Sequence, residues 1–263
     1  MYSKVYKMRY RLTLSYDGSA FSGWQIQNNA RTIQDIIQHS LSVLLKEEVT
    51  VTGAGRTDTG VNAINYIAHF DSDVPDLDAD NLGYKLNAIL PKEITVHKIV
   101  TETVDFHARF DAISREYHYF IHRSRDPFAE RYSYFCGYNI NLEEMNKAAA
   151  YLLGTHDFSC FEKKGGSNRT SICTVYDAEW TTYTPTHVGL LGYPAKKDDY
   201  IVFRIRADRF LRNMVRAIVG SLIDVGRGKR EAEWIRTLTL GGERSCAGES
   251  VPGKALFLNK VDY

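Results

Sequence analysis

The sequence predicts an α+β protein made of two halves, each with the element order strand, helix, strand, strand, helix, strand. Segments with a two-residue apolar period, helical apolar stripes between them, and repetition of this order along the 263 residues all favour this class. The order is that of a ferredoxin-like βαββαβ unit. We expect two such halves, residues 1–105 and 106–263, with mainly antiparallel sheets side by side and a central active-site cleft between them.

The first half is assigned from its periodic segments. Apolar residues alternate with polar ones over residues 8–16, which predicts a half-buried strand. A helical stripe begins at Ile33, with Thr32 as the expected N-cap. Further strands are expected at 49–52, 64–70 and 94–100, and a further helix at 82–90, ended by Pro91.

The second half repeats the order over a longer stretch. Asn141 and Glu144 have the spacing of a capping box, which predicts a helix that stops before Gly154. The longest apolar stripe begins at Phe210 and predicts a helix that ends at Gly226. The remaining expected elements are strands at 113–121, 172–180, 200–207 and 255–261, a helix at 231–240, and a surface excursion at 181–197.

Composition indicates an ordinary globular protein. A formal net charge of +1 creates no overall field that attracts nucleic acid, so phosphate binding must come from local clusters. The four cysteines lack C-x-x-C spacing, which argues against zinc and against a disulfide framework and fits a reducing cytoplasm. No apolar segment approaches membrane-spanning length, and residues 1–4 lead into a strand without a signal-peptide core. We therefore expect a cytoplasmic protein without a membrane segment.

A glycine-rich loop between two predicted strands carries the candidate reactive group. Residues 53–63 contain three glycines and one carboxylate, Asp58. Arg56 lies two residues earlier and favours the ionised form of that carboxylate. An ionised, positioned aspartate is a candidate nucleophile or base. The alternative is an aspartate that only forms a turn by bonding the local backbone.

Two other site classes fit this loop less well. A dinucleotide-binding fingerprint would need a glycine in place of Asp58 and a helix after the loop, whereas a strand is predicted there. The triplet Asp58-Thr59-Gly60 also resembles that of aspartic proteases, in which two carboxylates share a proton. The triplet occurs once, so a protease would have to be a homodimer, and Arg56 would oppose proton sharing.

Basic residues are concentrated in four clusters of an otherwise nearly neutral chain. Any one cluster could be an ordinary solvated face. Four clusters with intervening tyrosines instead favour a segregated phosphate-binding surface and a polynucleotide partner. The clusters are Arg204, Arg206, Arg209, Arg212 and Arg216; His122, Arg123, Arg125 and Arg131; Lys163, Lys164 and Arg169; and Arg227, Lys229 and Arg230.

Several separated motifs extend from the first strand to the C-terminal half. They are Tyr16-Asp17-Gly18 with Gly23-Trp24-Gln25, Gly55-Arg56-Thr57-Asp58 with Gly60-Val61, Phe106-His107-Ala108-Arg109-Phe110 with Arg115-Glu116-Tyr117, residues 152–158, and Phe210-Leu211 with Met214-Val215-Arg216. Their ordered combination resembles the pseudouridine synthase family that modifies transfer RNA, in its bacterial branch that acts on the anticodon stem-loop.

The resemblance implies a role for each matching site residue. Asp58 would be the catalytic aspartate, Arg216 its partner, and Tyr117 the aromatic residue that packs against the target base. On the predicted helix, Arg212 lies one turn before Arg216 and is the substitute for it. The other implied substrate-binding residues are Leu256, which lines the base pocket, and Arg56 and Arg109, which contact the RNA backbone or the extruded nucleotide.

The resemblance also implies a reaction and its partners. Family members convert uridine to pseudouridine at positions 38, 39 and/or 40 of tRNA, act as homodimers, and use neither metal nor organic cofactor. The reaction involves no redox change, so a carboxylate that attacks uracil C6 or ribose C1′, or acts first as a base at C2′, would suffice. This chain departs from the commonest pattern at Thr59, Asn62 and Ala255, where Ala, His and Gly are usual. A noncatalytic RNA-binding protein would carry the same basic clusters.

Overall fold

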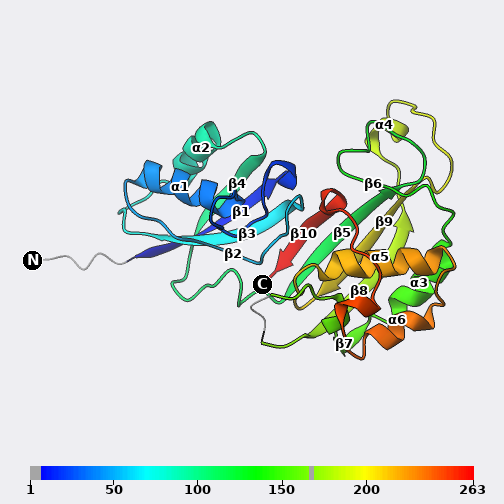
Figure 1. Ribbon diagram of the computed structural model, residues 1–263. Coiled ribbons are helices and arrows are strands. Elements are labelled where there is room, and N and C mark those ends of the chain that lie inside the picture. Colours follow the sequence, from blue (N-terminus) through cyan, green and yellow to red (C-terminus); the bar gives the residue numbers. More distant parts are fainter. Residues whose placement is uncertain (1–6, 166–168) are drawn as a thin grey trace, which may run out of the picture. The chain divides into compact units, whose positions relative to one another are not determined.

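The structure, a computed structural model that describes residues 7–165 and 169–263, contains two compact units of mixed α and β structure (Figure 1). Unit 1 comprises the described residues up to Ile113 together with Leu258–Tyr263, and unit 2 comprises Ser114–Phe257 apart from 166–168. Residues 1–6, which include the segment expected to lack a signal-peptide core, lie outside the described residues.

Unit 1 is an antiparallel sheet with two helices on one face (Figure 1). The central strand β1 pairs with β3 on one side and with β4 on the other. The short strand β2 pairs with β3, which gives the order β4-β1-β3-β2, and the unit 1 part of β10 also lies beside β3. The elements are β1 (Met8–Tyr16), α1 (Ile33–Leu45), β2 (Val51–Gly53), β3 (Asn62–Ser72), α2 (Ala79–Ile89), β4 (Ile94–Glu102) and β10 (Leu256–Asp262).

The core of unit 1 follows the predicted apolar periods. Tyr10, Leu12, Leu14 and Tyr16 on β1 are all buried, which confirms the expected alternation from Tyr10 onward, whereas Met8 at the start of the strand is exposed. Thr32 occupies the N-cap position of α1 as predicted, but its side chain makes no capping hydrogen bond there. The start of α1 is therefore fixed by burial of its apolar face more than by its cap.

Unit 2 contains a second antiparallel series of strands, in the order β5-β9-β8-β7, and β6 pairs with β5 in parallel. The helices α3, α5 and α6 pack together (Figure 1). Three short elements, β6, β7 and α4, are not among those predicted. The elements are β5 (Ser114–His122), β6 (Tyr134–Phe135), α3 (Leu142–Ala150), β7 (Gly154–Asp157), β8 (Ile172–Thr182), α4 (Thr186–Gly189), β9 (Tyr200–Ala207), α5 (Met214–Gly226) and α6 (Glu233–Leu238).

The start of α5 differs from the prediction. The helix begins at Met214 instead of Phe210, because Asn213 adopts a left-handed conformation with a φ of 66° that interrupts a right-handed helix. Arg212 therefore lies in the turn before α5, and the prediction that it occupies the same helix as Arg216, one turn earlier, is wrong. By contrast, Asn141 caps α3 as predicted, with its side-chain oxygen accepting from two backbone amides.

A close backbone crossing attaches residues 247–252, here called the strap, to α5. A Cβ at Gly220 would lie 1.7 Å from the carbonyl oxygen of Glu249. We expect Gly220→Ala to push the strap off α5 and lower the free energy of unfolding by about 3 kcal/mol, measured by urea denaturation.

Gly83 provides the matched control within a helix. The nearest heavy atom to a Cβ at Gly83 in α2 is 4.0 Å away. Gly83→Ala is therefore expected to raise the free energy of unfolding by about 0.5–1 kcal/mol, because alanine favours the helix. Equal destabilisation by the two substitutions would contradict the steric explanation.

Candidate active site

The loop that carries Asp58 follows β2 and is held by the segment that follows β1. The Trp24 amide donates to the Thr57 carbonyl at 3.1 Å, and the Tyr16 hydroxyl lies 2.9 Å from the Thr57 hydroxyl. Thr57 is buried, whereas Asp58 beside it is half-exposed. The backbone beside the candidate catalytic residue is thus anchored, while Asp58 itself is half-exposed.

Two glycines allow that segment to approach the loop. A Cβ at Gly18 would lie 2.1 Å from the Val61 carbonyl oxygen, and a Cβ at Gly23 would lie 2.4 Å from the Thr57 carbonyl oxygen. Gly23 also has a φ of +89°, which favours glycine. The motifs at 16–18 and 23–25 therefore serve the Asp58 loop by fixing its backbone.

Two stacked aromatic rings pack against the start of the loop. Trp24 and Tyr66 have ring centroids 4.1 Å apart, and both rings are buried. The Tyr66 hydroxyl donates to the Gly55 carbonyl. A Cβ at Gly53 would lie 2.2 Å from the Tyr66 hydroxyl oxygen. These rings are packing residues that leave no room for a side chain at Gly53.

Asn62, one of the three departures from the usual family pattern, has a structural role in this chain. Its side chain is 1% exposed, and its Oδ1 accepts from the Gly18 amide at 2.9 Å. Asn62 therefore ties the end of the loop to the segment after β1. The sequence could not indicate this contact, because the two residues are 44 positions apart.

Arg56 and Arg109, both predicted to contact RNA, are exposed on unit 1. The Arg56 Nε donates to the Gln25 side chain at 3.3 Å. The Arg109 guanidinium lies 5.7 Å from the ring centroid of Phe110, which is 74% exposed. A cation beside an exposed aromatic ring is an arrangement suited to contact with a nucleotide. Phe110 was not among the predicted site residues, because the exposure of its ring cannot be derived from the motif.

A tight turn and a buried histidine support Arg109. The amides of Arg109 and Phe110 both donate to His107 Nδ1 at 3.2 Å. The Ala108 amide donates to Nδ1 of His69, which is buried. Burial, together with the charge of Arg9, lowers the pKa of His69 to about 4. His69 is therefore a neutral acceptor in the folded protein.

The low pKa of His69 predicts a loss of stability in weak acid. The pKa of the unfolded side chain is 6.5, so between that value and about 4 the unfolded chain binds the additional proton. The free energy of unfolding is therefore expected to fall as the pH decreases through this window. His69→Gln, which keeps an acceptor but does not titrate, should flatten that dependence in urea titrations. An unchanged slope would contradict the assignment.

The remaining predicted active-site residues belong to unit 2. Tyr117 on β5 is 9% exposed, and its ring meets Phe210 edge to face at 5.0 Å. Leu256 is buried at the start of β10. The Arg216 Nε on α5 donates to the Val251 carbonyl of the strap at 2.7 Å, and the Val251 amide donates back to the Arg216 carbonyl at 3.2 Å. The strap thus orients the Arg216 side chain.

The predicted basic clusters have different environments. The Arg212 backbone carbonyl accepts from the Lys163 amide at 3.0 Å, and the Arg212 guanidinium donates to the Lys164 carbonyl at 3.4 Å, so members of two clusters lie together. Arg204 instead forms an ion pair with Asp177 at 2.7 Å, which reduces its effect on a phosphate. Arg227 stacks on the Tyr138 ring with a separation of 3.5 Å. Only part of the predicted basic surface is therefore available as local positive charge.

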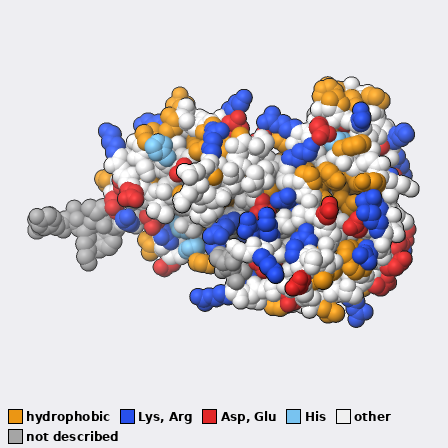
Figure 2. Space-filling view, viewed as in Figure 1, with side chains coloured by type: hydrophobic (Ala, Val, Ile, Leu, Met, Phe, Trp, Pro, Cys, Tyr) orange, Lys and Arg blue, Asp and Glu red, His pale blue; other side chains and the backbone are white. Residues whose placement is uncertain are grey.

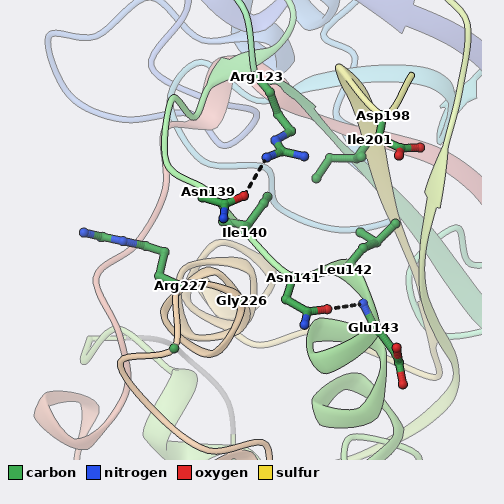
Figure 3. Close-up of a pocket in the computed structure, with 11 residues that line it drawn as sticks. Arg123, Asn139, Ile140, Asn141, Leu142, Glu143, Asp198, Ile201, Gly226 and Arg227 are labelled. Atoms are coloured by element: carbon green, nitrogen blue, oxygen red, sulfur yellow. Dashed lines mark hydrogen bonds between the residues drawn. The ribbon is translucent and has the colours of Figure 1, made fainter. Parts of the chain in front are cut away.

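A pocket of about 640 Å³ in unit 2 lies between the start of α3 and the end of α5 (Figure 3). Within it, Arg123 donates to the Asn139 side chain at 3.3 Å. Its described lining includes both basic and acidic groups, among them Arg227 and Glu143, and contains none of the predicted site residues. The pocket is therefore separate from the candidate active-site residues.

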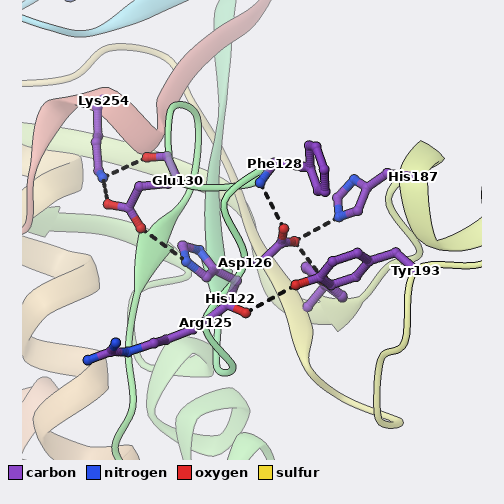
Figure 4. A network of polar contacts seen from close by, with 9 residues as sticks. His122, Arg125, Asp126, Phe128, Glu130, His187, Tyr193 and Lys254 are labelled. Carbon is purple, nitrogen blue, oxygen red and sulfur yellow. Dashed lines mark hydrogen bonds and ion pairs between the residues drawn. The ribbon is translucent and has the colours of Figure 1, made fainter.

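A polar network in unit 2 joins the loop after β5 to the segment around α4 (Figure 4). The Asp126 carboxylate, 4% exposed, accepts from Tyr200 and His187 at 2.7 Å and from the Phe128 amide at 2.9 Å. Burial raises the pKa of Asp126, but these hydrogen bonds outweigh it and leave the pKa below its ordinary value. The network holds the segment around α4, in which Leu190 and Leu191 are both highly exposed. Figure 2 shows hydrophobic side chains on one face of the molecule.

Among residues 7–165 and 169–263, no group of three or more His, Cys, Asp or Glu side chains is arranged to hold a metal ion. Within the same ranges, no helix is long and apolar enough to cross a membrane.

Comparison with known proteins identifies the class. Residues 13–111 and 148–263 match the family described as tRNA pseudouridine synthase, whose members are isomerases. The tRNA pseudouridine synthase A of Bacteroides fragilis is 43% identical over 256 residues, covering 97% of this chain and 96% of the relative. That of Bacillus subtilis is 36% identical over 260 residues, covering 97% and 99%. The chain therefore belongs to the tRNA pseudouridine synthase A family, which confirms the resemblance predicted from the motifs.

Proposed function

We propose that the protein isomerises uridine to pseudouridine at positions 38, 39 and/or 40 of the tRNA anticodon stem-loop, with Asp58 as the nucleophile. The observation that carries the proposal is the anchored loop: the Thr57 carbonyl and hydroxyl are both hydrogen-bonded, while the adjacent Asp58 is half-exposed. A reactive group on a fixed backbone is what covalent catalysis requires.

The proposed reaction requires no change of oxidation state. The bond between uracil N1 and ribose C1′ breaks, the base turns, and the bond between C5 and C1′ forms. The C5 proton leaves and N1 gains a proton, so the product is an isomer of the substrate. Asp58 would add to uracil C6 or ribose C1′ and leave again, or would first remove a proton at C2′. Each route restores the carboxylate, so we propose catalysis without metal or organic cofactor.

Arg216 is proposed to keep the nucleophile charged and oriented. A guanidinium offers a planar set of donors that matches a carboxylate, and it stays protonated when buried. The hydrogen bond from Arg216 Nε to the Val251 carbonyl supports this role, because it fixes one edge of the guanidinium and limits the directions in which the remaining N–H groups can donate. Arg212, in the turn before α5, is proposed to contact the substrate instead.

Tyr117 is proposed to stack on the target base after the base leaves the helical stack. Extruding a base costs a few kcal/mol, and stacking on an aromatic ring offsets about 1–3 kcal/mol of that cost. The edge-to-face contact with Phe210 supports the proposal, because it holds the Tyr117 ring in one orientation. Leu256 would line the same base pocket, and Arg56 and Arg109 would contact the backbone or the extruded nucleotide.

Replacing Tyr117 separates stacking from hydrogen bonding. Tyr117→Phe is expected to retain activity within a few-fold, whereas Tyr117→Ala should lower kcat/KM by about 10-fold to 100-fold, the equivalent of one lost stacking contact. Single-turnover kinetics with tRNA would measure both. Equal losses in the two variants would instead indicate that the hydroxyl group is required.

We further propose the architecture and assembly expected from the sequence. Residues 1–105 and 106–263 would form two ferredoxin-like halves with a central cleft, and two chains would form a homodimer. The order β4-β1-β3-β2 in unit 1 supports the first half of this proposal, since it is the strand order of one ferredoxin-like sheet. Sedimentation of the purified protein would test the dimer.

The test of the function is tritium release from tRNA labelled at uridine C5. Three substrates, each retaining a single uridine at position 38, 39 or 40, would show which site is used. Release from at least one of them, abolished when all three uridines are replaced, is expected. Tight tRNA binding without any release would favour a noncatalytic RNA-binding protein and overturn the proposal.

A further inference from the structure

Two of the four cysteines lie together in unit 2, outside the candidate active-site residues. Cys160 belongs to the 3₁₀ turn Ser159–Phe161, and Cys246 belongs to the 3₁₀ turn Arg244–Cys246. The two turns pack against each other, and Cys246 lies close enough to Cys160 to help raise the pKa of its thiol, although burial is the larger cause.

The backbone around this pair is fixed by a neighbouring contact. The Gly242 amide donates to the Ser159 hydroxyl at 2.9 Å. A Cβ at Gly242 would lie 3.0 Å from the Cys160 sulfur. The segment that precedes Cys246 therefore lies directly against the Cys160 side chain.

The pair combines an accessible thiol with a buried one. Cys246 is exposed, whereas Cys160 is 1% exposed. The other two cysteines, Cys136 and Cys173, are both buried. Burial raises the pKa of Cys173 to about 11, so that thiol is unreactive at neutral pH. An oxidant in solution therefore meets Cys246 first, with a second thiol beside it.

We propose that Cys160 and Cys246 are a redox modification site that closes to a reversible disulfide. In the first step, the Cys246 thiolate attacks one oxygen of hydrogen peroxide, so that the S–O bond forms, the O–O bond breaks, and water leaves after protonation. In the second step, the Cys160 sulfur attacks the Cys246 sulfur, the S–S bond forms, and the hydroxyl leaves as water with the Cys160 proton. Two thiols are oxidised, and one peroxide is reduced to two waters.

The disulfide would connect the two turns next to the strap. Arg244, in the same turn as Cys246, donates to the Ser250 hydroxyl at 2.8 Å, and Val251 beside it holds Arg216. The cross-link would thus tether the strap, which orients Arg216, to the turn that follows β7. The inference stands apart from the proposed function, because the bond can be detected without any measurement of activity.

Peptide mapping of the full-length protein tests the proposal. Trypsin places Cys160 on peptide 148–163 and Cys246 on peptide 245–254, and each of these peptides contains a single cysteine. In the reduced native protein, Cys246 is expected to be alkylated by iodoacetamide and Cys160 protected. After mild peroxide treatment, alkylation of Cys246 should be lost, and the two peptides should appear cross-linked with the loss of two hydrogens. Dithiothreitol should restore both peptides.

Single cysteine-to-serine variants test whether each thiol is needed for the cross-link. Cys246→Ser, at an exposed position, should fold normally and leave the Cys160 peptide reduced after peroxide treatment. Cys160→Ser should leave Cys246 as a sulfenic acid that reacts with dimedone. Oxidation of Cys246 to sulfinic acid in the wild type, with the Cys160 peptide still reduced, would overturn the proposal. So would cross-links that join either cysteine to Cys136 or Cys173.

Discussion

Asp58→Asn is expected to lower turnover by about 10⁴-fold or more, because the amide cannot act as the nucleophile. Binding of tRNA should be nearly unchanged, since the substitution alters little volume and the loop is anchored by its neighbour Thr57, through Trp24 and Tyr16. Tritium release from labelled tRNA measures the first quantity, and filter binding measures the second. The separation between them distinguishes a chemical role from a role in RNA affinity.

Asp73→Asn is the matched control for the Asp58 variant. Asp73 is an exposed aspartate in unit 1 that lies outside the motifs of the family. Its replacement makes the same change of charge and is expected to leave turnover within about twofold, as for most surface substitutions. Wild-type turnover by Asp58→Asn would exclude Asp58 as the nucleophile, and equal losses in both variants would indicate a general effect of charge.

Arg216→Met is expected to lower kcat by about 10²–10³-fold, the size of effect seen when one preorganised charged donor is removed from a reacting centre. Methionine keeps much of the volume but loses the charge and the bond from Nε to Val251. Arg216→Lys should recover only part of the loss, because an ammonium cannot contact Val251 and a carboxylate with a fixed fork of donors. Steady-state kinetics would separate kcat from KM.

Arg236→Met serves as the control for Arg216. Arg236 is exposed in the last turn of α6, so its replacement removes a similar side chain from the same unit. Its kcat should remain within about twofold of the wild-type value. If Arg216→Met raised KM alone, the residue would contribute only to tRNA affinity, and its proposed partnership with Asp58 would be wrong.

The regular elements were predictable because their signals are local. The alternation from Met8 to Tyr16 and the stripe that begins at Ile33 reflect burial of one face, which repeats every few residues. The start of α5 was not predictable, since Phe210 and Leu211 continue the apolar stripe while Asn213 adopts a left-handed conformation. An apolar period thus indicates which face is buried, but not the residue at which a helix begins.

Part of the candidate site was also predictable. The motifs identified Asp58, Arg216 and Tyr117 as candidates from the order of residue types along the chain. The tertiary contacts that hold these side chains were not predictable. The strap carbonyl that orients Arg216 lies 35 residues further along the chain, and the exposure of Phe110 depends on the turn built by His107.

From the sequence alone followed the α+β class, the order of the longer elements, the family, and the residues to which chemistry is assigned. The contacts between distant residues, such as Gly18 with Asn62 and His69 with Ala108, depend on the tertiary structure. The reason is physical. Periodicity and turn chemistry act over a few residues and are written into neighbouring positions, whereas these contacts join distant segments and exist only after the core has packed.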